Sequence, residues 1–243
     1  MSLAVNHTLV VGGTRGIGRE AARIFAAEGR TVSVIGRSLP ADPLPGVRTF
    51  AADLTDDTAL ERALGEILAA GPLRSLVLSQ RWRGSGDAWA GELQTSLTAT
   101  RNLVERLAGS FEPAGDRSIV LVSSVVGRLV ASEQEASYHV AKAGLCQLAR
   151  FYAVRLGPAG IRVNSVSPSV FVKEESRDYY RQQQQLADLF ARITPLRRMG
   201  TAAEVAAAIH FLCSPAASFV TGQELVVDGG ISLQAQPSLA RSL

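Results

Sequence analysis

Three side chains in the middle of the chain have the types and spacing of a proton-transfer site. Tyr138 and Lys142 lie four residues apart in a helix-forming stretch, so they share one helix face. A free tyrosine has a pKa of about 10, and we expect the nearby ammonium to lower it by favouring the phenolate. Ser124 follows an apolar run, and its hydroxyl can hydrogen-bond a reacting oxygen. The set predicts a tyrosine that gives a proton to a carbonyl as a hydride reaches the carbonyl carbon.

A second group of residues has the form of a phosphate-binding loop. The segment 12–18 reads Gly12-Gly13-Thr14-Arg15-Gly16-Ile17-Gly18 and joins an apolar run to a helix-forming stretch. Glycines at such a junction permit a tight turn, a close approach of backbone to phosphate, and close packing of helix on strand. The N-terminus of the helix adds free N–H groups and the positive end of its dipole. We therefore expect Gly12, Thr14, Gly16, Ile17 and Gly18 to bind the diphosphate of a dinucleotide.

Two arginines indicate which dinucleotide it is. Arg15 lies inside the loop, and Arg37 follows the next apolar run, where an NAD-binding protein usually carries an acid. Gly36 stands there instead, and guanidinium groups match the oxygens of a 2′-phosphate. This pattern predicts NADP(H), although both arginines could also be plain surface charge. Asp53 and Leu54, after the third apolar run, either hold the adenine or, for Asp53, cap the following turn.

The elements that must position these residues alternate regularly along the chain. Short, nearly continuous apolar runs predict strands buried on both faces of a parallel sheet, at 8–11, 31–35, 48–51, 75–78, 118–123, 162–167 and 224–227. Between them, stretches rich in Ala, Leu, Glu and Arg predict helices at 17–28, 59–70, 92–108, 136–156 and 202–212. Strand–helix alternation over the whole length predicts an α/β fold, a single doubly wound Rossmann-type domain over 1–243 with about seven parallel strands and helices on both faces.

Composition excludes several other classes of protein. With 243 residues, 47% of them hydrophobic, the chain can bury a full core without disulfides or metals. Cys146 and Cys213 are far apart and lack neighbours at metal-ligand spacing, so we predict no metal site. The net charge of +3 comes without a dense basic run, which argues against nucleic acid as a partner. No apolar run reaches the roughly 18 residues that span a membrane, and no leader pattern stands at residue 1, so we expect a cytoplasmic protein.

Two segments interrupt the alternation of strands and helices. Residues 80–91 predict a polar, glycine-rich loop with two tryptophans, and residues 173–192 are charged and rich in glutamine. Excursions of this kind in α/β domains often cover ligands. We expect these segments, above all 173–192, to determine the substrate.

Together the motifs resemble the short-chain dehydrogenase/reductase family, and most closely its 3-oxoacyl-carrier-protein reductase type, over nearly the whole chain. The resemblance is carried by the glycine loop, Ser124, Tyr138-x-x-x-Lys142, and the segments 164–168 and 221–230. It implies that Tyr138 is the acid/base, that Lys142 binds the nicotinamide ribose, and that Ser124 orients the substrate oxygen. It also implies that Pro168 and the residues after it, including Phe171, contact the nicotinamide. It further implies a homo-oligomer, a tetramer or a dimer, that is built through the helices at 92–108 and 136–156.

The chain departs from this family at several places near the expected site, including Ser169 and Lys173 after Pro168, and two further departures concern the expected site residues. Where the family has Asn-Asn-Ala-Gly after the fourth strand, lining the adenine ribose, this chain has Leu78-Ser79-Gln80-Arg81. Ser79 is then the expected cofactor contact, and Arg81 replaces a glycine. Where the family has an asparagine that holds a water in a proton relay, the chain has Ser96, which we expect to take that catalytic role.

Three functions are consistent with these residues. The first is reduction of a carbonyl, or oxidation of a secondary alcohol, with NADP(H) and a small-molecule substrate. The second, suggested by the altered segment 78–81 and Ser96, is a family member with no net redox change, such as an isomerase or dehydratase. The third is a cofactor-binding protein without turnover, against which the intact set of Ser124, Tyr138 and Lys142 argues.

Overall fold

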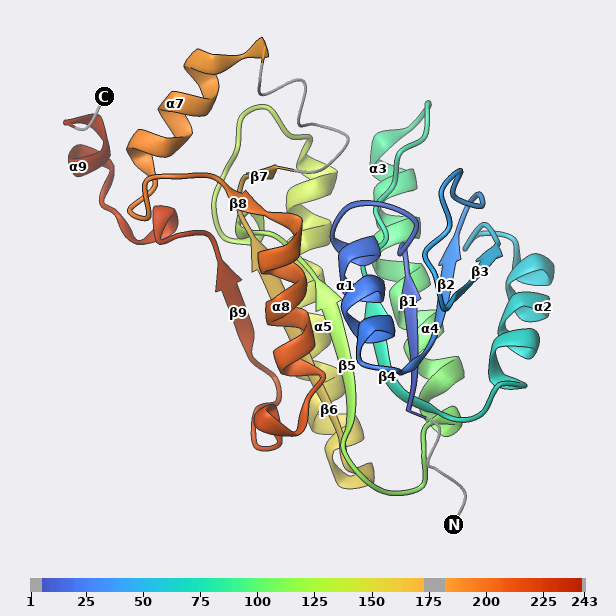
Figure 1. The fold of residues 1–243 in the computed structure, drawn as a ribbon. Helices are drawn as coiled ribbons and strands as arrows, with labels where there is room; N and C mark the ends of the chain where they lie inside the picture. Colours follow the sequence, from blue (N-terminus) through green and yellow to red (C-terminus); the bar gives the residue numbers. More distant parts are fainter. Residues whose placement is uncertain (1–5, 173–181, 242–243) are drawn as a thin grey trace.

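A seven-stranded parallel sheet forms the centre of the molecule (Figure 1). The computed structural model describes residues 6–172 and 182–241. The strand order is β3-β2-β1-β4-β5-β6-β9, and the strands are β1 (His7–Val11), β2 (Thr31–Gly36), β3 (Val47–Ala51), β4 (Leu73–Leu78), β5 (Arg117–Val122), β6 (Ile161–Pro168) and β9 (Glu224–Val227). This order, with helices on both faces, confirms the predicted doubly wound α/β fold.

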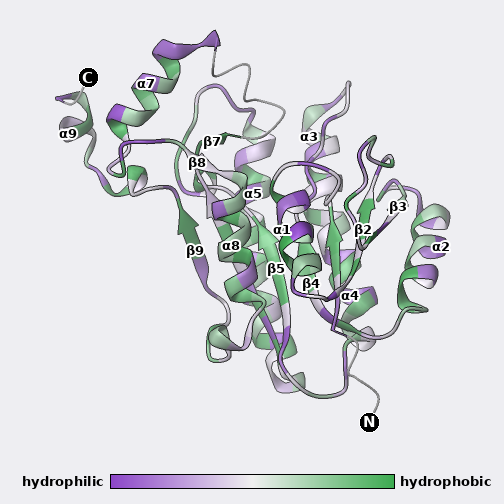
Figure 2. Cartoon of the chain, viewed as in Figure 1, coloured by the Kyte–Doolittle hydropathy of each residue, from purple (hydrophilic) through white to green (hydrophobic). Residues whose placement is uncertain are grey.

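The helices divide between the two faces of the sheet. One face is covered by α1 (Gly16–Ala27) and α8 (Ala202–Leu212), and the other by α2 (Asp57–Leu68), α4 (Ala99–Leu107) and α5 (Ala136–Leu156) (Figure 1). Each strand contributes to both layers because its side chains alternate between faces. On β5, for example, Ile119 and Leu121 pack with α4 and α5, whereas Val120 packs with α8. Figure 2 shows the resulting apolar colour along the central strands.

The strand order places a crevice at one end of the sheet. β1 lies between β2 and β4, so the chain leaves β1 toward one edge and returns through β4 toward the other. At such a switch point the loops after neighbouring strands diverge, and ligands bind beyond the carboxyl ends of the strands. The segment after β1 carries the glycine motif, and the loops after β4 and β5 carry Ser79 and Ser124.

The predicted helix at 92–108 differs from the structure in its start and its interior. The helical segment begins with α3 (Ala88–Glu92), because the Asp87 carboxylate accepts hydrogen bonds from the Trp89 and Ala90 nitrogens at 2.9 and 3.2 Å and caps it. A π-helical turn, η1 (Leu93–Thr98), then precedes α4. The prediction of a loop over 80–91 was therefore wrong for its last residues, where the Asp87 cap had been overlooked.

Several smaller elements lie around the carboxyl end of the sheet. β7 (Phe171–Val172) pairs in parallel with β8 (Gly200–Thr201), and two more helices are α7 (Gln184–Ile193) and α9 (Gln236–Ala240). Short 3₁₀ turns cover Ala108–Ser110, Val125–Gly127, Gly157–Ala159, Pro215–Ala217 and Ile231–Leu233. Of the predicted covering segment 173–192, residues 173–181 lie outside the described residues, and α7 accounts for most of the rest. No helix within the described ranges has the length and apolarity needed to cross a membrane.

Candidate cofactor and active site

One cleft of about 340 Å³ opens at the carboxyl ends of the strands and gathers most of the predicted site residues. Those that line it are Gly12, Thr14, Arg15, Gly16, Ile17, Arg37, Asp53, Leu54, Ser79, Ser124, Tyr138, Lys142, Pro168 and Phe171. Gly18 and Ser96 do not line the cleft; both are buried behind its wall. Residues from seven separate segments of the chain thus converge on one volume, as the resemblance implies.

The glycine loop is held against β4 by contacts that exclude a side chain. Gly12 has a φ of 78°, and a Cβ there would lie 2.6 Å from the Gln80 nitrogen. A Cβ at Gly18 would lie 2.5 Å from the Gly12 oxygen. Arg15, the residue before α1, makes no capping hydrogen bond through its side chain. The first N–H groups of α1 therefore have no side-chain cap, which suits a helix terminus that binds an anion.

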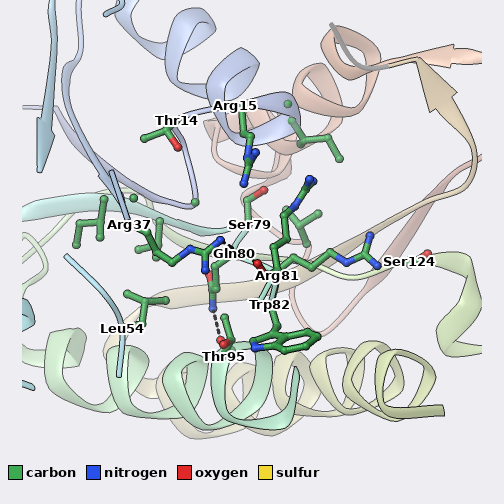
Figure 3. Close-up of a pocket in the computed structure, with 18 of the residues that line it drawn as sticks. Thr14, Arg15, Arg37, Leu54, Ser79, Gln80, Arg81, Trp82, Thr95 and Ser124 are labelled. Carbon is green, nitrogen blue, oxygen red and sulfur yellow. Dashed lines mark hydrogen bonds between the residues drawn. The ribbon is translucent and has the colours of Figure 1, made fainter. Parts of the chain in front are cut away.

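Arg15 and Arg37 approach the same part of the cleft from different elements. Both are exposed, and neither forms an ion pair within the described ranges. Figure 3 shows the Arg15 side chain reaching into the pocket from the start of α1, and Arg37 reaching in from the end of β2. Arg37 donates a hydrogen bond to the Arg83 carbonyl oxygen at 3.3 Å. Two guanidinium groups without a carboxylate partner therefore face one end of the cleft.

Asp53 fits both of the roles that the sequence left open, a cap of the turn after β3 and a contact for the adenine. Its carboxylate accepts hydrogen bonds from the Thr55 nitrogen at 2.9 Å and the Thr55 hydroxyl at 2.7 Å, so it caps the turn after β3. These hydrogen bonds, with a smaller contribution from the Arg37 charge, lower the pKa of Asp53. Asp53 and Leu54 also line the cleft. A fixed, ionised carboxylate and an apolar side chain are thus available for an adenine.

Gln80, part of the altered segment after β4, ties that strand to the helix behind it. Its amide donates to the Thr100 hydroxyl at 2.8 Å and to the Thr95 carbonyl oxygen at 3.5 Å (Figure 3). Its Oε1 atom is buried and has no hydrogen-bond partner among the described residues. A buried acceptor without a partner is destabilising, so a ligand that donates a hydrogen bond to it would be favoured. Gln80 thus offers an unused acceptor in the wall of the cleft.

The three residues that the sequence predicts to transfer a proton meet at the other end of the cleft. Tyr138 shares a hydrogen bond with the Ser124 side chain. The Ser124 hydroxyl also donates to the Pro168 carbonyl oxygen at 3.3 Å. Lys142 is 3% exposed, its Nζ donates to the Val122 carbonyl oxygen at 3.0 Å, and it lies 5.4 Å from the centre of the Tyr138 ring. The first turns of α5 and the end of β5 therefore bring together the residues that the spacing selected.

The expected effect on the pKa of Tyr138 was wrong in direction. Burial disfavours the phenolate and raises the pKa of Tyr138 above its usual range. The largest opposing effect comes from the Arg81 charge, followed by the hydrogen bond with Ser124. The cation that acts most on the phenol is thus Arg81, which the sequence had marked only as a replacement of the family's glycine.

Arg81 stands directly against Tyr138. Its guanidinium carbon lies 4.2 Å from the centre of the Tyr138 ring, in a cation–π arrangement. It also donates to the Gln134 amide oxygen at 3.1 Å. In place of the glycine that the resemblance led us to expect, the chain carries a positive charge on the face of its tyrosine.

Sequence reasoning missed Glu92, a second charged residue that acts on Tyr138. Glu92 is 3% exposed, and the fully buried Ser96 hydroxyl donates to its Oε1 at 2.5 Å. The Glu92 charge raises the pKa of Tyr138. The available signal was an acid four residues before Ser96, but its burial depends on α3 and the π-helical turn, which the sequence did not reveal.

The comparisons with known proteins agree with this geometry. The family model described as enoyl-(acyl carrier protein) reductase matches residues 11–232. The 3-oxoacyl-(acyl-carrier-protein) reductase MabA of Mycobacterium avium is 35% identical over 234 residues, covering 93% of this chain and 89% of the relative. Galactitol 2-dehydrogenase of Cereibacter sphaeroides is 32% identical over 239 residues, covering 92% and 94%. The ligand-free aldohexose dehydrogenase of Thermoplasma acidophilum shares the fold, with a TM-score of 0.85, 24% identity and 96% coverage of both chains. The chain therefore belongs to the short-chain dehydrogenase/reductase family.

Proposed function

We propose that this protein is an NADP(H)-dependent oxidoreductase that reduces a carbonyl compound, or oxidises the corresponding secondary alcohol, with Tyr138 as general acid/base. The observation that carries the proposal is the meeting of Ser124, Tyr138 and Lys142 at one end of a cleft whose other end holds the glycine loop, Arg15 and Arg37. One end suits the reacting atoms and the other suits a phosphorylated adenosine.

The residues present fit a nicotinamide dinucleotide, the cofactor class that this family uses. The uncapped start of α1 and the glycines that leave no room for a side chain suit the diphosphate. The unpartnered Gln80 Oε1 suits a ribose hydroxyl beside Ser79. Lys142 would bind the nicotinamide ribose, and Pro168 and Phe171 would contact the nicotinamide. Bound NADPH would supply the hydride.

The choice of NADP(H) over NAD(H) rests on charge. Arg15 and Arg37 carry two positive charges without carboxylate partners in the described ranges, beside a strand end that has Gly36 and no acid. A guanidinium fork matches phosphate oxygens, whereas a ribose 2′-hydroxyl is usually held by an acid. We therefore expect the 2′-phosphate to lie between these arginines.

The proton steps belong to the chain's own residues. The Tyr138 hydroxyl gives its proton to the carbonyl oxygen, and the Ser124 side chain hydrogen-bonds the same oxygen and orients it. Lys142, close to the phenol, favours the phenolate that remains. Ser96, hydrogen-bonded to Glu92 behind the cleft, belongs to the path by which a proton returns to Tyr138. Oxidation of an alcohol follows the same steps in reverse.

Oxidation of NADPH in the presence of ketones, aldehydes and acyl thioesters tests this proposal. We expect turnover with NADPH and weaker turnover with NADH, and we expect Tyr138→Phe to lower kcat by about 100-fold to 10,000-fold, the usual contribution of general acid catalysis. Retained NADPH binding by Tyr138→Phe in calorimetry controls for folding. The proposal fails if no carbonyl compound is reduced, or if Tyr138→Phe leaves the rate unchanged.

Arg81 supports rival functions as well, because a guanidinium on the tyrosine face could obstruct hydride transfer. A family member without net redox chemistry, such as an isomerase or dehydratase, would form product with no change in nicotinamide absorbance. A cofactor-binding protein without turnover would bind NADPH in calorimetry and form no product. These outcomes separate both rivals from the reductase.

A further inference from the structure

Arg81 is a charged group in the cleft that the proposed proton and cofactor steps do not use. Its guanidinium packs on the Tyr138 ring, and its hydrogen bond goes to the neutral Gln134 amide. It forms no ion pair with any residue in 6–172 or 182–241. Within the described ranges, a positive charge with no carboxylate at ion-pair distance therefore stands beside the group that would protonate the substrate.

Arg81 is too far along the cleft to share the role of Arg15 and Arg37. In Figure 3, Arg37 and Leu54 lie at one end of the pocket, Ser124 lies at the opposite end, and Arg81 lies between Gln80 and Ser124. Its 4.2 Å contact with Tyr138 fixes the guanidinium at the Ser124 end. A 2′-phosphate at the adenosine end would thus be met by Arg15 and Arg37, and Arg81 is left for a group at the reacting end.

The chain is held in place on both sides of Arg81, and on the preceding side the Gln80 amide donates to the Thr100 hydroxyl at 2.8 Å. The Trp82 indole packs so closely against α3 that a methyl group at Gly91 would overlap it, and Gly84 also contacts the same ring. The Arg83 carbonyl oxygen accepts the hydrogen bond from Arg37. Because the chain is anchored before and after Arg81, the Arg81 side chain stays in the wall of the cleft.

We propose that Arg81 binds an anionic oxyacid group of the substrate, so that the preferred carbonyl compound carries a carboxylate or a phosphate ester near its carbonyl. This inference rests on the proposed reductase function. A guanidinium matches such groups with paired, charge-assisted hydrogen bonds. Hydrogen bonds to charged groups contribute about 1.5–3 kcal/mol, or about 10-fold to 100-fold in kcat/KM. Specificity would thus be set by a residue that replaces the family's glycine.

Matched pairs of substrates test the inference. Straight-chain oxo acids with the carbonyl one to three carbons from the carboxylate are compared with their methyl esters, and hydroxyacetone phosphate is compared with hydroxyacetone. Assays at about pH 6 keep Tyr138 protonated in every variant, since its pKa lies above the usual value of about 10. The wild type should prefer the charged member of at least one pair by about 10-fold to 100-fold in kcat/KM.

The variants identify the source of that preference. Arg81→Met should reduce the ratio of charged to uncharged kcat/KM to near one, and Arg81→Lys should restore part of it. Arg23→Gln, which removes an exposed arginine paired with Glu20 on α1, should keep the wild-type ratio. Equal use of acids and esters by the wild type, or a preference that survives in Arg81→Met, overturns the inference and leaves the reductase intact. Failure to reduce any member of any pair, while other ketones, aldehydes or acyl thioesters are reduced, overturns the inference alone, and failure with every carbonyl compound overturns both.

Discussion

Two charges of opposite sign act on the Tyr138 phenol. Arg81 packs on its ring and lowers the pKa of the phenol, and the buried Glu92 raises it. Tyr138 and Lys142 could be found from sequence because two residues four apart on a helix must share a face. Arg81 and Glu92 could not be assigned in the same way, because their effect depends on how the segment 81–91 folds back over α5.

Single substitutions should move the pH profile in opposite directions. If Tyr138 is the acid that we propose, reduction needs its protonated form, so activity persists below the pKa of Tyr138 and is lost as the pH rises through it. Glu92→Gln removes a charge that raises this pKa and should shift the loss of activity to lower pH. Arg81→Met removes a charge that lowers it and should shift the loss to higher pH.

The measurement is kcat against pH for carbonyl reduction at saturating NADPH. Glu61→Gln serves as the control, since this exposed acid pairs with Arg106 on the far side of the α4 layer and should leave the profile in place. Shifts of the two variants in the same direction would contradict the electrostatic account of Tyr138.

At the scale of elements, the continuous helical segment of α3, η1 and α4 determines where Ser96 and Trp82 lie relative to the cleft. The Asp87 cap starts this segment before the predicted residue 92, and η1 carries the buried Ser96. Gly91, which has no side chain, leaves room for the Trp82 ring. The sequence predicted a helix here, but its periodicity does not distinguish a π-helical turn from an α-helical one. The glycine loop was predicted more completely, because its spacing is imposed by backbone contacts with β4.

Gly91→Ala should displace the Trp82 ring and thereby change the position of the neighbouring Arg81 side chain. A methyl group at this position overlaps the indole, and overpacking of this kind costs about 1–3 kcal/mol. We expect a change in tryptophan fluorescence, measured in a Trp89→Phe background, together with a higher KM for the substrate.

Gly65→Ala is the matched control for this prediction. Gly65 lies within α2, and a Cβ there would meet nothing within 4 Å. The substitution should therefore raise the free energy of unfolding by about 0.5–1 kcal/mol and leave the fluorescence unchanged. Unchanged fluorescence and KM in Gly91→Ala would show that Trp82 does not hold the segment.

At the scale of the whole molecule, the alternating pattern was sufficient to predict the sheet and its two helical layers. Apolar runs buried on both faces require helices on both sides, and chain order then restricts the topology. Assembly is less accessible from sequence, because an apolar helix position can face a core or a second chain. On α5, Val140, Phe151 and Val154 are 45%, 53% and 80% exposed, and their spacing places them on one face.

We predict that this face of α5 joins copies of the chain in a homo-oligomer, a dimer or a tetramer. Phe151→Glu combined with Val154→Glu would bury charge in such an interface and should give smaller particles in light scattering coupled to size exclusion. Arg23→Gln on α1 should keep the wild-type mass. A wild-type protein that is monomeric at micromolar concentration would rule out this interface.

Hydride transfer itself gives the most direct test of the central claim. NADPH carrying deuterium at both C4 positions of its dihydronicotinamide is incubated with the protein and a carbonyl substrate, and the product is analysed by mass spectrometry. The account predicts one deuterium on the former carbonyl carbon, formed by the wild type and largely lost with Tyr138→Phe. Product that carries no deuterium would contradict it and would point to chemistry without net redox change.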